Sequence, residues 1–260
     1  LDAPFVVFAV PSHAMRAIAS QYRFSSQSIL ISVAKGIENE SLKRMSEVLH
    51  ELQPENAIVA LSGPSHAEEV AVDKPTSVVV AGHDEIICRR VQCLFMSHRF
   101  RVYTSSDLAG VELGGALKNV VALAAGVCDG LGLGDNAKAA LITRGLAEMA
   151  RLGIAMGANP LTFAGLSGLG DLVVTCASKL SRNRSVGERI AQGDRLEDIL
   201  SGMTMVAEGV RTTRSAHALA RKYNVEMPIT HQVYRTLFED ADPRNAVTEL
   251  MLRDAKPEWI

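Results

Sequence analysis

Cysteine is scarce in this sequence, neither sign of charge predominates, and no apolar run is both long and unbroken. The four cysteines include no Cys-x-x-Cys pair, and a chain of 260 residues does not need disulfides to fold. We therefore expect a reducing compartment and a cytoplasmic location. The formal net charge of −2, with both signs spread along the chain, provides no broad attraction for nucleic acid or for an anionic membrane.

The most apolar stretch is too short and too interrupted to suggest a membrane span. Residues 112–129 contain Lys118 and Asn119, and they fall short of the ~20 apolar residues that cross a bilayer. We predict a buried helix here and no membrane insertion.

Several catalytic motifs are missing as well. The chain has no GxxxxGK(S/T), HExxH or GxSxG motif, so kinase, zincin and serine-hydrolase functions lack their usual support. The histidines and cysteines show no metal-ligand spacing, and we predict no metal site. GxGxxG, the loop that opens a complete dinucleotide-binding fold, is absent too. Because the strand-like residues 4–10 follow the first residue almost at once, we interpret the chain as beginning within a domain.

The pattern of the sequence changes near residue 105. Before it, short β-branched runs alternate with amphipathic segments, which indicates βαβ units and a mostly parallel sheet. After it, nearly every segment is typical of helix. We predict an α/β fold followed by an all-α one, with domains at residues 1–105 and 106–260. The expected strands lie near residues 4–10, 28–34, 57–62, 76–82 and 100–104, and the expected helices near residues 13–22, 40–52, 84–96, 107–128, 136–157, 182–192, 208–223, 228–239 and 243–254.

An α/β domain followed by an all-α domain suits a nucleotide-binding domain joined to a substrate-binding domain. Ligands bind beyond the carboxyl ends of parallel strands, where a second domain can close the cleft. Two helix starts carry local signals: we expect Ser12 to cap the first helix, and Asp84 to place an acid at the positive end of another.

Lys118 is the most informative single position, because a lysine in so apolar a helix needs either water or a partner. Burial lowers the pKa of a lysine, which suits it to act as a general acid toward a carbonyl oxygen and as a base in reverse. The alternative is a lysine whose head extends to solvent. The neighbouring Gly114 and Gly115 favour a functional role, since we expect them to open room beside the ammonium.

Two motifs of the helical half could join Lys118. Asp171 lies on a glycine-rich turn at a helix start, where it could pair with Lys118 or simply cap the helix. Residues 181–184, Ser-Arg-Asn-Arg, combine a hydroxyl, an amide and two guanidinium groups at a helix start, a chemistry suited to phosphate. A short basic loop of this kind is otherwise an ordinary surface feature.

Two turns of the first half point to the same cleft. Lys35 follows one predicted strand and the Gly-Pro-Ser-His-Ala turn, residues 63–67, follows the next, so both lie at carboxyl ends of the sheet. Each could also be an ordinary βα turn. Glu208, near the start of a long helix, is by itself a first-turn acid favoured by the helix dipole.

A series of segments in this order resembles the bacterial and organelle-type NAD(P)-dependent glycerol-3-phosphate dehydrogenases. The segments are Ala-Val-Pro-Ser (9–12), Ala-Lys-Gly (34–36), Ser-Gly-Pro-Ser-His-Ala (62–67), Glu-Leu-Gly-Gly-Ala-Leu-Lys-Asn (112–119), Gly-Leu-Gly-Asp-Leu (168–172), Ser-Arg-Asn-Arg (181–184), Val-Ala-Glu-Gly (206–209) and Met-Pro-Ile (227–229). The resemblance covers essentially the whole chain, and the combination is far more specific than any member.

The resemblance implies an incomplete Rossmann-type NAD(P)-binding domain, a helical substrate domain and NADP or NAD as cofactor. It implies reversible reduction of dihydroxyacetone phosphate to sn-glycerol 3-phosphate, for glycerophospholipid synthesis, by a homodimer. Lys118 matches the family's proton donor and acceptor. The matched substrate-binding positions are Lys35, Gly63, Ser65, Lys118, Asp171, Ser181, Arg182 and Asn183, and the matched cofactor-binding positions are Lys35, Ala67, Arg182, Val206 and Glu208.

The chain departs from the family at its start, where the family carries a strand, the GxGxxG loop, a helix and further strands. Since a βαβ unit takes ~30 residues or more, we expect two strand–helix units to be missing. We predict that these 260 residues alone bind cofactor poorly or not at all. The absent position after the second strand leaves NADP and NAD equally open. Two alternatives are a non-catalytic binding or assembly module and a related two-domain dehydrogenase of a hydroxyacid or sugar-acid phosphate.

Overall fold

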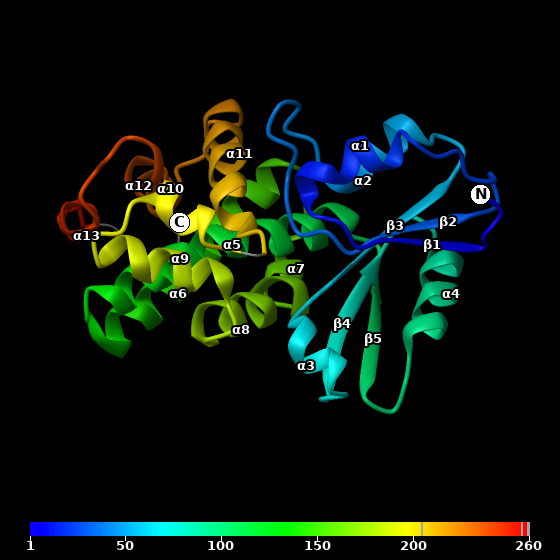
Figure 1. The fold of residues 1–260 in the computed structure, drawn as a ribbon, viewed down its shortest axis with the longest axis horizontal. Coiled ribbons are helices and arrows are strands. Elements are labelled where there is room, and N and C mark those ends of the chain that lie inside the picture. The colour runs from blue at the N-terminus through cyan, green and yellow to red at the C-terminus, as the bar shows by residue number, and fades with distance from the viewer. Residues whose placement is uncertain (204, 256, 259–260) are drawn as a thin grey trace.

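The computed structural model describes residues 1–203, 205–255 and 257–258, and its two halves differ in architecture (Figure 1). The strands of the described residues all lie in the first half. They are β1 (Phe5–Phe8), β2 (Ile29–Ser32), β3 (Ala57–Ser62), β4 (Thr76–Ala81) and β5 (Phe100–Ser105), and they form one sheet in that order. β3 and β4 pair antiparallel and the other neighbours pair parallel, so the predicted, mostly parallel sheet is confirmed.

Short helices cover parts of both sheet faces. α1 (Met15–Ala19) and α2 (Met45–Leu52) pack on the face to which Leu30 points, and α4 (Glu85–Phe95) packs on the opposite face. Successive residues of a strand point to opposite faces, which is why β2, buried at every position, serves both layers. A fourth helix, α3 (Ala67–Ala71), follows β3 after the turn formed by residues 63–66.

Of the two expected helix starts, one is confirmed and one is wrong. The Asp84 side chain accepts the N–H groups of Ile86 and Ile87 and so caps α4. Ser12 instead lies inside a 3₁₀ turn, Ser12–Ala14, that precedes α1. Its N–H and hydroxyl donate to Glu208 at 2.9 and 2.5 Å, a partner 196 residues away that local spacing could not indicate.

From residue 108 onward the described residues contain helices and no strand. The long helices are α5 (Leu108–Gly130), α6 (Gly134–Ala155), α9 (Arg182–Ala191), α11 (Glu208–Lys222), α12 (Pro228–Phe238) and α13 (Pro243–Met251), and the short ones are α7 (Pro160–Phe163), α8 (Asp171–Ala177) and α10 (Leu196–Ser201). A π-helical turn, Leu166–Gly170, leads into α8. The prediction of an all-helical second half is confirmed.

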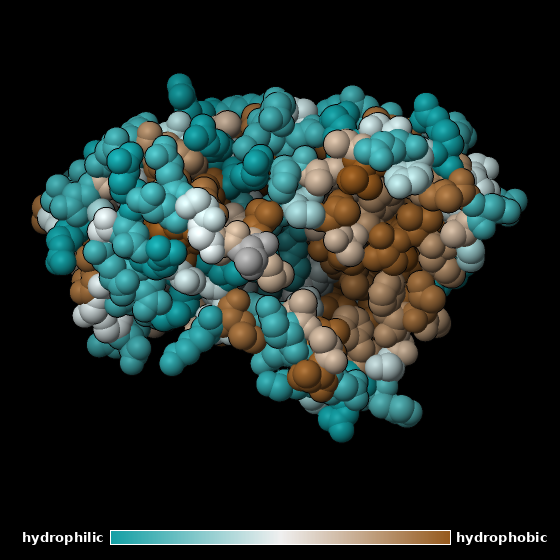
Figure 2. Space-filling model, viewed as in Figure 1, coloured by the Kyte–Doolittle hydropathy of each residue, from teal (hydrophilic) through white to brown (hydrophobic). Residues whose placement is uncertain are grey.

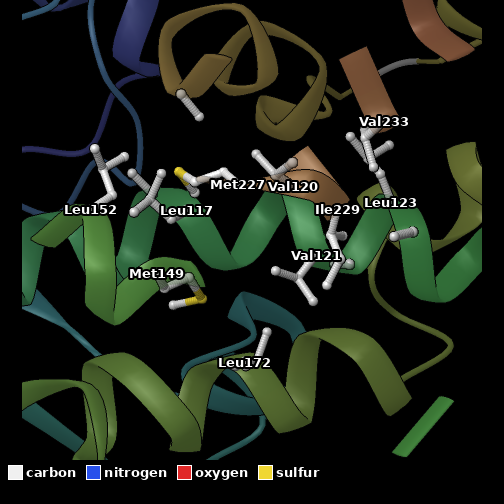
Figure 3. Close-up of a cluster of buried hydrophobic side chains, with 14 of the residues drawn as sticks. Leu117, Val120, Val121, Leu123, Met149, Leu152, Leu172, Met227, Ile229 and Val233 are labelled. Carbon is white, nitrogen blue, oxygen red and sulfur yellow. The ribbon is translucent and has the colours of Figure 1, made fainter. Parts of the chain in front are cut away.

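α5 forms the centre of this helical region. Its side chains, Leu117, Val120 and Val121 among them, meet apolar residues of α6, α8 and α12 in one continuous core (Figure 3). Glycines let α9 approach α5 closely, because a Cβ at Gly126 would collide with the Arg184 carbonyl and one at Gly187 with the Leu123 carbonyl. The close approach holds the start of α9 beside α5.

Two helical stretches are long and apolar enough to cross a membrane by length and composition alone. One is α5, whose most apolar window is 94% buried inside the protein, and the other spans residues 160–177, of which 39% of the window is buried. The core helix of a globular protein passes the same test as a membrane span. The expectation of a buried helix at residues 112–129 is confirmed.

Candidate active site

Lys118 lies in the middle of α5 with only 5% of its surface exposed, so its ammonium does not extend to solvent. It donates to Asp171 Oδ1 at 2.5 Å and to Thr175 Oγ1 at 2.8 Å. Burial, and after it the nearby Lys35 ammonium, lower the pKa of Lys118 to about 8, while Asp171 opposes the shift. An ammonium has three protons, and the described residues supply no third acceptor.

Asp171 links this lysine to a second one. It is the first residue of α8, where Gly170 holds the N-cap position, and its Oδ2 accepts from Lys35 Nζ at 2.8 Å. Burial alone would raise the pKa of Asp171, but the Lys35 and Lys118 ammonium groups together hold it below the ordinary value. Asp171 is therefore a buried carboxylate between two cations and does not cap its helix.

Lys35 comes from the sheet region and is fully engaged. Besides Asp171, its Nζ donates to the Gly63 carbonyl at 2.8 Å and to Ser65 Oγ at 3.4 Å. These three acceptors match its three protons. Since Lys35 follows β2 and Gly63 follows β3, the parallel pairing of these strands brings the two turns together.

Gly114 and Gly115 do not open empty space beside Lys118, contrary to expectation. A Cβ at Gly114 would lie 2.7 Å from the Ser167 carbonyl oxygen, and one at Gly115 would lie 2.6 Å from Ser62 Oγ. The room is taken by the π-helical turn on one side and by β3 on the other. The glycines thus allow α5 to lie directly against the elements that carry Asp171 and Gly63.

The Ser-Arg-Asn-Arg segment opens α9, as predicted, with each side chain in a defined contact. Ser181 caps the helix by accepting the Arg184 N–H, and Arg182 Nη1 donates to the Val206 carbonyl at 2.7 Å. Asn183 Nδ2 donates to Asn119 Oδ1 at 2.9 Å. Arg184 is paired with Asp129 at 2.5 Å, so this second guanidinium belongs to the packing of α9 on α5.

A chain of amide contacts connects the α9 start to the lysine cluster. Asn183 Oδ1 accepts the Gly209 N–H at 2.9 Å, and Asn119 Nδ2 donates to the Lys35 carbonyl at 3.2 Å. Glu208, beside Gly209, holds Ser12 of the sheet region. Segments far apart in sequence therefore meet where the two regions join.

Two family models match the chain. One, described as the NAD-dependent glycerol-3-phosphate dehydrogenase N-terminus, matches residues 1–88, and the other, described as the C-terminus, matches residues 107–248. The chain belongs to this family.

Relatives from bacteria cover nearly all of the chain. A glycerol-3-phosphate dehydrogenase, NAD(P)+, of Syntrophotalea carbinolica is 58% identical over 97% of this chain and 78% of its own length. The protein of the same name from Desulfitobacterium hafniense is 55% identical over 99% of this chain and 74% of its own. A crystal structure of glycerol-3-phosphate dehydrogenase from Coxiella burnetii, 39% identical, covers 96% of this chain and 78% of its own with a TM-score of 0.93.

More distant dehydrogenases share the fold alone. A D-mandelate dehydrogenase structure covers 95% of this chain with a TM-score of 0.54 but is 10% identical. The alternative of a related hydroxyacid dehydrogenase is therefore supported at the level of architecture only, whereas family membership rests on sequence along the chain.

Each position matched to the family has a definite place in the structure. Lys35, Gly63, Ser65, Lys118 and Asp171 contact one another directly or through Lys35. Ser181, Arg182, Asn183 and Val206 form a second group around the α9 start, and Glu208 joins it through Gly209. Ala67 is exposed at the first residue of α3, two residues beyond Ser65.

Sequence reasoning missed the roles of two residues, Thr175, which contacts both Lys118 and Asp171, and Asn119, which contacts Asn183 and the Lys35 carbonyl. Thr175 Oγ1 accepts from Lys118 and donates to the Asp171 carbonyl at 2.6 Å, and Asn119 supports Asn183. The spacing of Thr175, four residues after Asp171, places both on one helix face and could have indicated it. Among the described residues no three His, Cys, Asp or Glu side chains gather as a metal-binding set.

Proposed function

We propose that this chain carries out the reaction of its family, reversible reduction of dihydroxyacetone phosphate to sn-glycerol 3-phosphate with NADPH or NADH, and that Lys118 is its proton donor and acceptor. One observation carries the proposal: the buried Lys118 ammonium has two of its protons on Asp171 and Thr175 and a third without an acceptor among the described residues. That third proton suits the oxygen of a substrate carbonyl.

The proton moves in step with the hydride. A nicotinamide cofactor, when bound, would supply the hydride for reduction of the substrate carbonyl carbon and would accept it in oxidation. Lys118 Nζ gives its free proton to the carbonyl oxygen as that oxygen gains negative charge, and is left as a neutral amine. In oxidation the amine takes the hydroxyl proton back. A pKa of about 8 makes both forms of Lys118 accessible near neutral pH.

Asp171 and Lys35 prepare this transfer. The Asp171 carboxylate orients the Lys118 ammonium and opposes the fall of its pKa. Lys35 holds Asp171 from the opposite side and joins it to the Gly63 and Ser65 turn, which we propose as a substrate contact. Fixed geometry of this kind is what a proton transfer requires of the residues around it.

We propose that Ser181, Arg182 and Asn183 hold the substrate phosphate at the start of α9. The support is a helix N-terminus, a guanidinium and an amide gathered at one point and connected through Asn119 to the Lys35 carbonyl. Arg184 is not included, because Asp129 and the close approach of α9 occupy it.

The residues at the junction of the two regions fit the nicotinamide end of the cofactor. We propose Lys35, Ala67, Arg182, Val206 and Glu208 as its contacts, supported by the Arg182 to Val206 contact and by the Ser12 to Glu208 contact. The 260 residues contain no GxGxxG loop for the pyrophosphate.

Family membership supports the wider assignments that we propose. We propose that residues 1–105 form the cofactor domain and residues 106–260 the substrate domain, and that the protein is a cytoplasmic homodimer without membrane insertion. Its product would enter glycerophospholipid synthesis.

Loss of NADPH on addition of dihydroxyacetone phosphate tests the function, with Lys118→Ala as the decisive variant. We expect the variant to lose roughly 10³-fold or more in kcat, because general acid catalysis contributes on this scale. Lys74→Ala, which removes an exposed lysine, is the matched control and should retain wild-type turnover. Reduction should fall above pH about 8 as the ammonium is lost, and oxidation should rise there. A Lys118→Ala protein that retains activity within tenfold would contradict the assignment.

A further inference from the structure

A cavity in the helical region lies apart from the proposed active site and is lined by three arginines. Its volume is about 860 Å³, within the range of small-molecule sites. The end of α9, α10, α11 and the end of α12 surround it, and Asn39, from the segment after β2, lines it from the sheet region. Among the described residues, its lining includes no position matched to the family's substrate or cofactor contacts. The cavity is therefore distinct from the site of the proposed reaction.

Two of the three arginines, Arg211 and Arg214, lack a counter-charge. Neither forms an ion pair or a hydrogen bond through its guanidinium group with any described residue. They lie three positions apart on α11, so they are neighbours on one helix face, where like charges repel each other. An oxyanion between the two guanidinium groups would remove that repulsion. The arrangement of this pair therefore favours an anionic ligand.

Aromatic side chains of α12 fix the position of one member of the pair. Arg214 Cζ lies 3.9 Å from the centroid of the Phe238 ring, which is a cation–π contact. Tyr234, one turn earlier, also lines the cavity and stacks on His217 of α11 with 4.0 Å between the ring centroids. A guanidinium that stacks through its face keeps the N–H groups on its edge for oxygen acceptors. Arg214 is thus held in place with its donors unused.

The acidic residues around the cavity leave that pair uncompensated. Asp194 is paired with Arg189 at 2.7 Å, and Glu197 lies 3.5 Å from Arg195, the third arginine. Asp240 lines the cavity too and pairs with no described cation. The cavity therefore combines two cationic donors with one carboxylate acceptor. A phosphate ester with hydroxyl groups offers the matching groups, an anion for the guanidinium groups and a donor for the carboxylate.

We propose that this cavity is a second ligand site, which binds a small phosphate ester with its phosphate between Arg211 and Arg214 and a hydroxyl group donating to Asp240. Arginine suits phosphate because its planar fork donates two parallel hydrogen bonds to the phosphate oxygens. A soluble ester is favoured over a lipid headgroup because the arginines line a hollow between helices. The second site goes beyond the proposed function and shares no residue with it.

Calorimetric titration with two phosphate esters tests the site. Ribose 5-phosphate carries hydroxyl groups, and methyl phosphate carries none. The titrations use Arg182→Gln, which weakens the phosphate contact proposed for the active site and does not alter the cavity lining. We expect this protein to bind ribose 5-phosphate roughly tenfold more tightly than methyl phosphate. Arg211→Gln and Arg214→Gln, added together to it, should weaken ribose 5-phosphate binding roughly 100-fold.

Two further pairs of substitutions separate a defined site from general positive charge. Arg221→Gln with Lys222→Gln removes two exposed cations from the end of the same helix and should leave binding unchanged. Arg211→Lys with Arg214→Lys keeps both charges but loses the planar forks, so it should weaken ribose 5-phosphate binding roughly tenfold. Thermal unfolding of every variant reports any loss of fold.

Four results would overturn the proposal. Binding of ribose 5-phosphate that survives the two glutamine substitutions on α11, or that falls equally in the Arg221 and Lys222 control, would show that these arginines form no site. Equal affinity for the two esters would remove the role of Asp240. Binding that is present in the wild type and lost in Arg182→Gln would confine phosphate esters to the proposed active site and leave the proposed function standing. Binding to phosphatidic acid vesicles without binding to ribose 5-phosphate would assign the arginines to a membrane surface.

Discussion

The helical region and the sheet region bury their apolar residues differently. Around α5 the helical region forms one continuous core, whereas the sheet region divides its core between clusters on the two faces of the sheet. Both regions leave some apolar side chains at the surface, with Val7 on β1 44% exposed in the sheet region and Leu161 on α7 77% exposed in the helical region. Figure 2 shows apolar residues gathered over the sheet region in this view.

This difference corresponds to the division of chemistry between the regions. A lysine pKa falls to about 8 only where water is excluded and partners are fixed, and the continuous core around α5 supplies both conditions for Lys118. The sheet region contributes Lys35 and the Gly63 to Ser65 turn from the ends of its strands. Correct pairing of the strands is enough to place such groups at the strand ends.

The largest expected effect concerns the carboxylate that joins the regions. Asp171→Asn should lower the reduction kcat by roughly 10³-fold, because two buried ammonium groups lose their shared counter-charge. Since Asp171 raises the pKa of Lys118, its removal should also move the fall of the reduction rate to a pH below about 8. Rate measurements across pH test both effects, with the exposed Asp135→Asn as control. Unchanged rates at all pH values would mean that the sheet region can function without this link.

A smaller effect compares the packing of the two regions through glycine. Gly187→Ala should destabilise the fold by about 3 kcal/mol, because its Cβ would meet the backbone of α5, which cannot move aside. Gly82→Ala in the sheet region should cost about 1 kcal/mol, since its Cβ would meet the Val59 and Cys88 side chains, which can adjust. Gly202→Ala, with no atom closer than 3.6 Å, is the control. Denaturant unfolding measures these losses of stability. Equal losses for Gly187→Ala and Gly82→Ala would show that the two regions do not differ in how closely they pack around these glycines.

Sequence patterns predicted the elements of both regions better than the contacts between them. The apolar surroundings of Lys118 and the glycine-rich turn before Asp171 are local signals, and they correctly indicated a buried lysine with a carboxylate partner. The order of βα turns likewise placed Lys35 beside Gly63. Periodicity and turn chemistry depend on residues only a few positions apart, which is why a buried lysine and the turns around the site can be predicted from sequence.

The sequence did not indicate the contacts between segments that are far apart along the chain. Ser12 is a residue type that often caps helices, yet its hydroxyl donates to Glu208. Gly114 was expected to leave open space, yet the Ser167 carbonyl occupies that space. From sequence Arg184 looks suited to bind phosphate, yet in the structure it forms an ion pair with Asp129. In each case the partner comes from an element whose position depends on the packing of the whole helical region.

The last prediction concerns two carboxyl groups, one in each region, whose pKa values are shifted in opposite directions. In the helical region Glu148 of α6 accepts the N–H groups of Ile229 and Thr230 at the start of α12, and burial raises its pKa to about 7. In the sheet region Glu38 has its pKa lowered by the hydrogen bond from Arg16.

Between its ordinary pKa of 4.5 and about 7, Glu148 binds a proton in the folded protein but not in the unfolded chain. Stability from this group is therefore present below pH 4.5 and is lost as pH rises to about 7, by up to about 3 kcal/mol. Denaturant unfolding at pH 5 and pH 8 should show this decline in the wild type and a smaller one in Glu148→Gln. Glu38→Gln should differ from the wild type by the same amount at both pH values, because Glu38 is ionised throughout that range. The same decline in wild type and Glu148→Gln would show that Glu148 is solvated and that the helical core is less closed at the start of α12 than at Lys118.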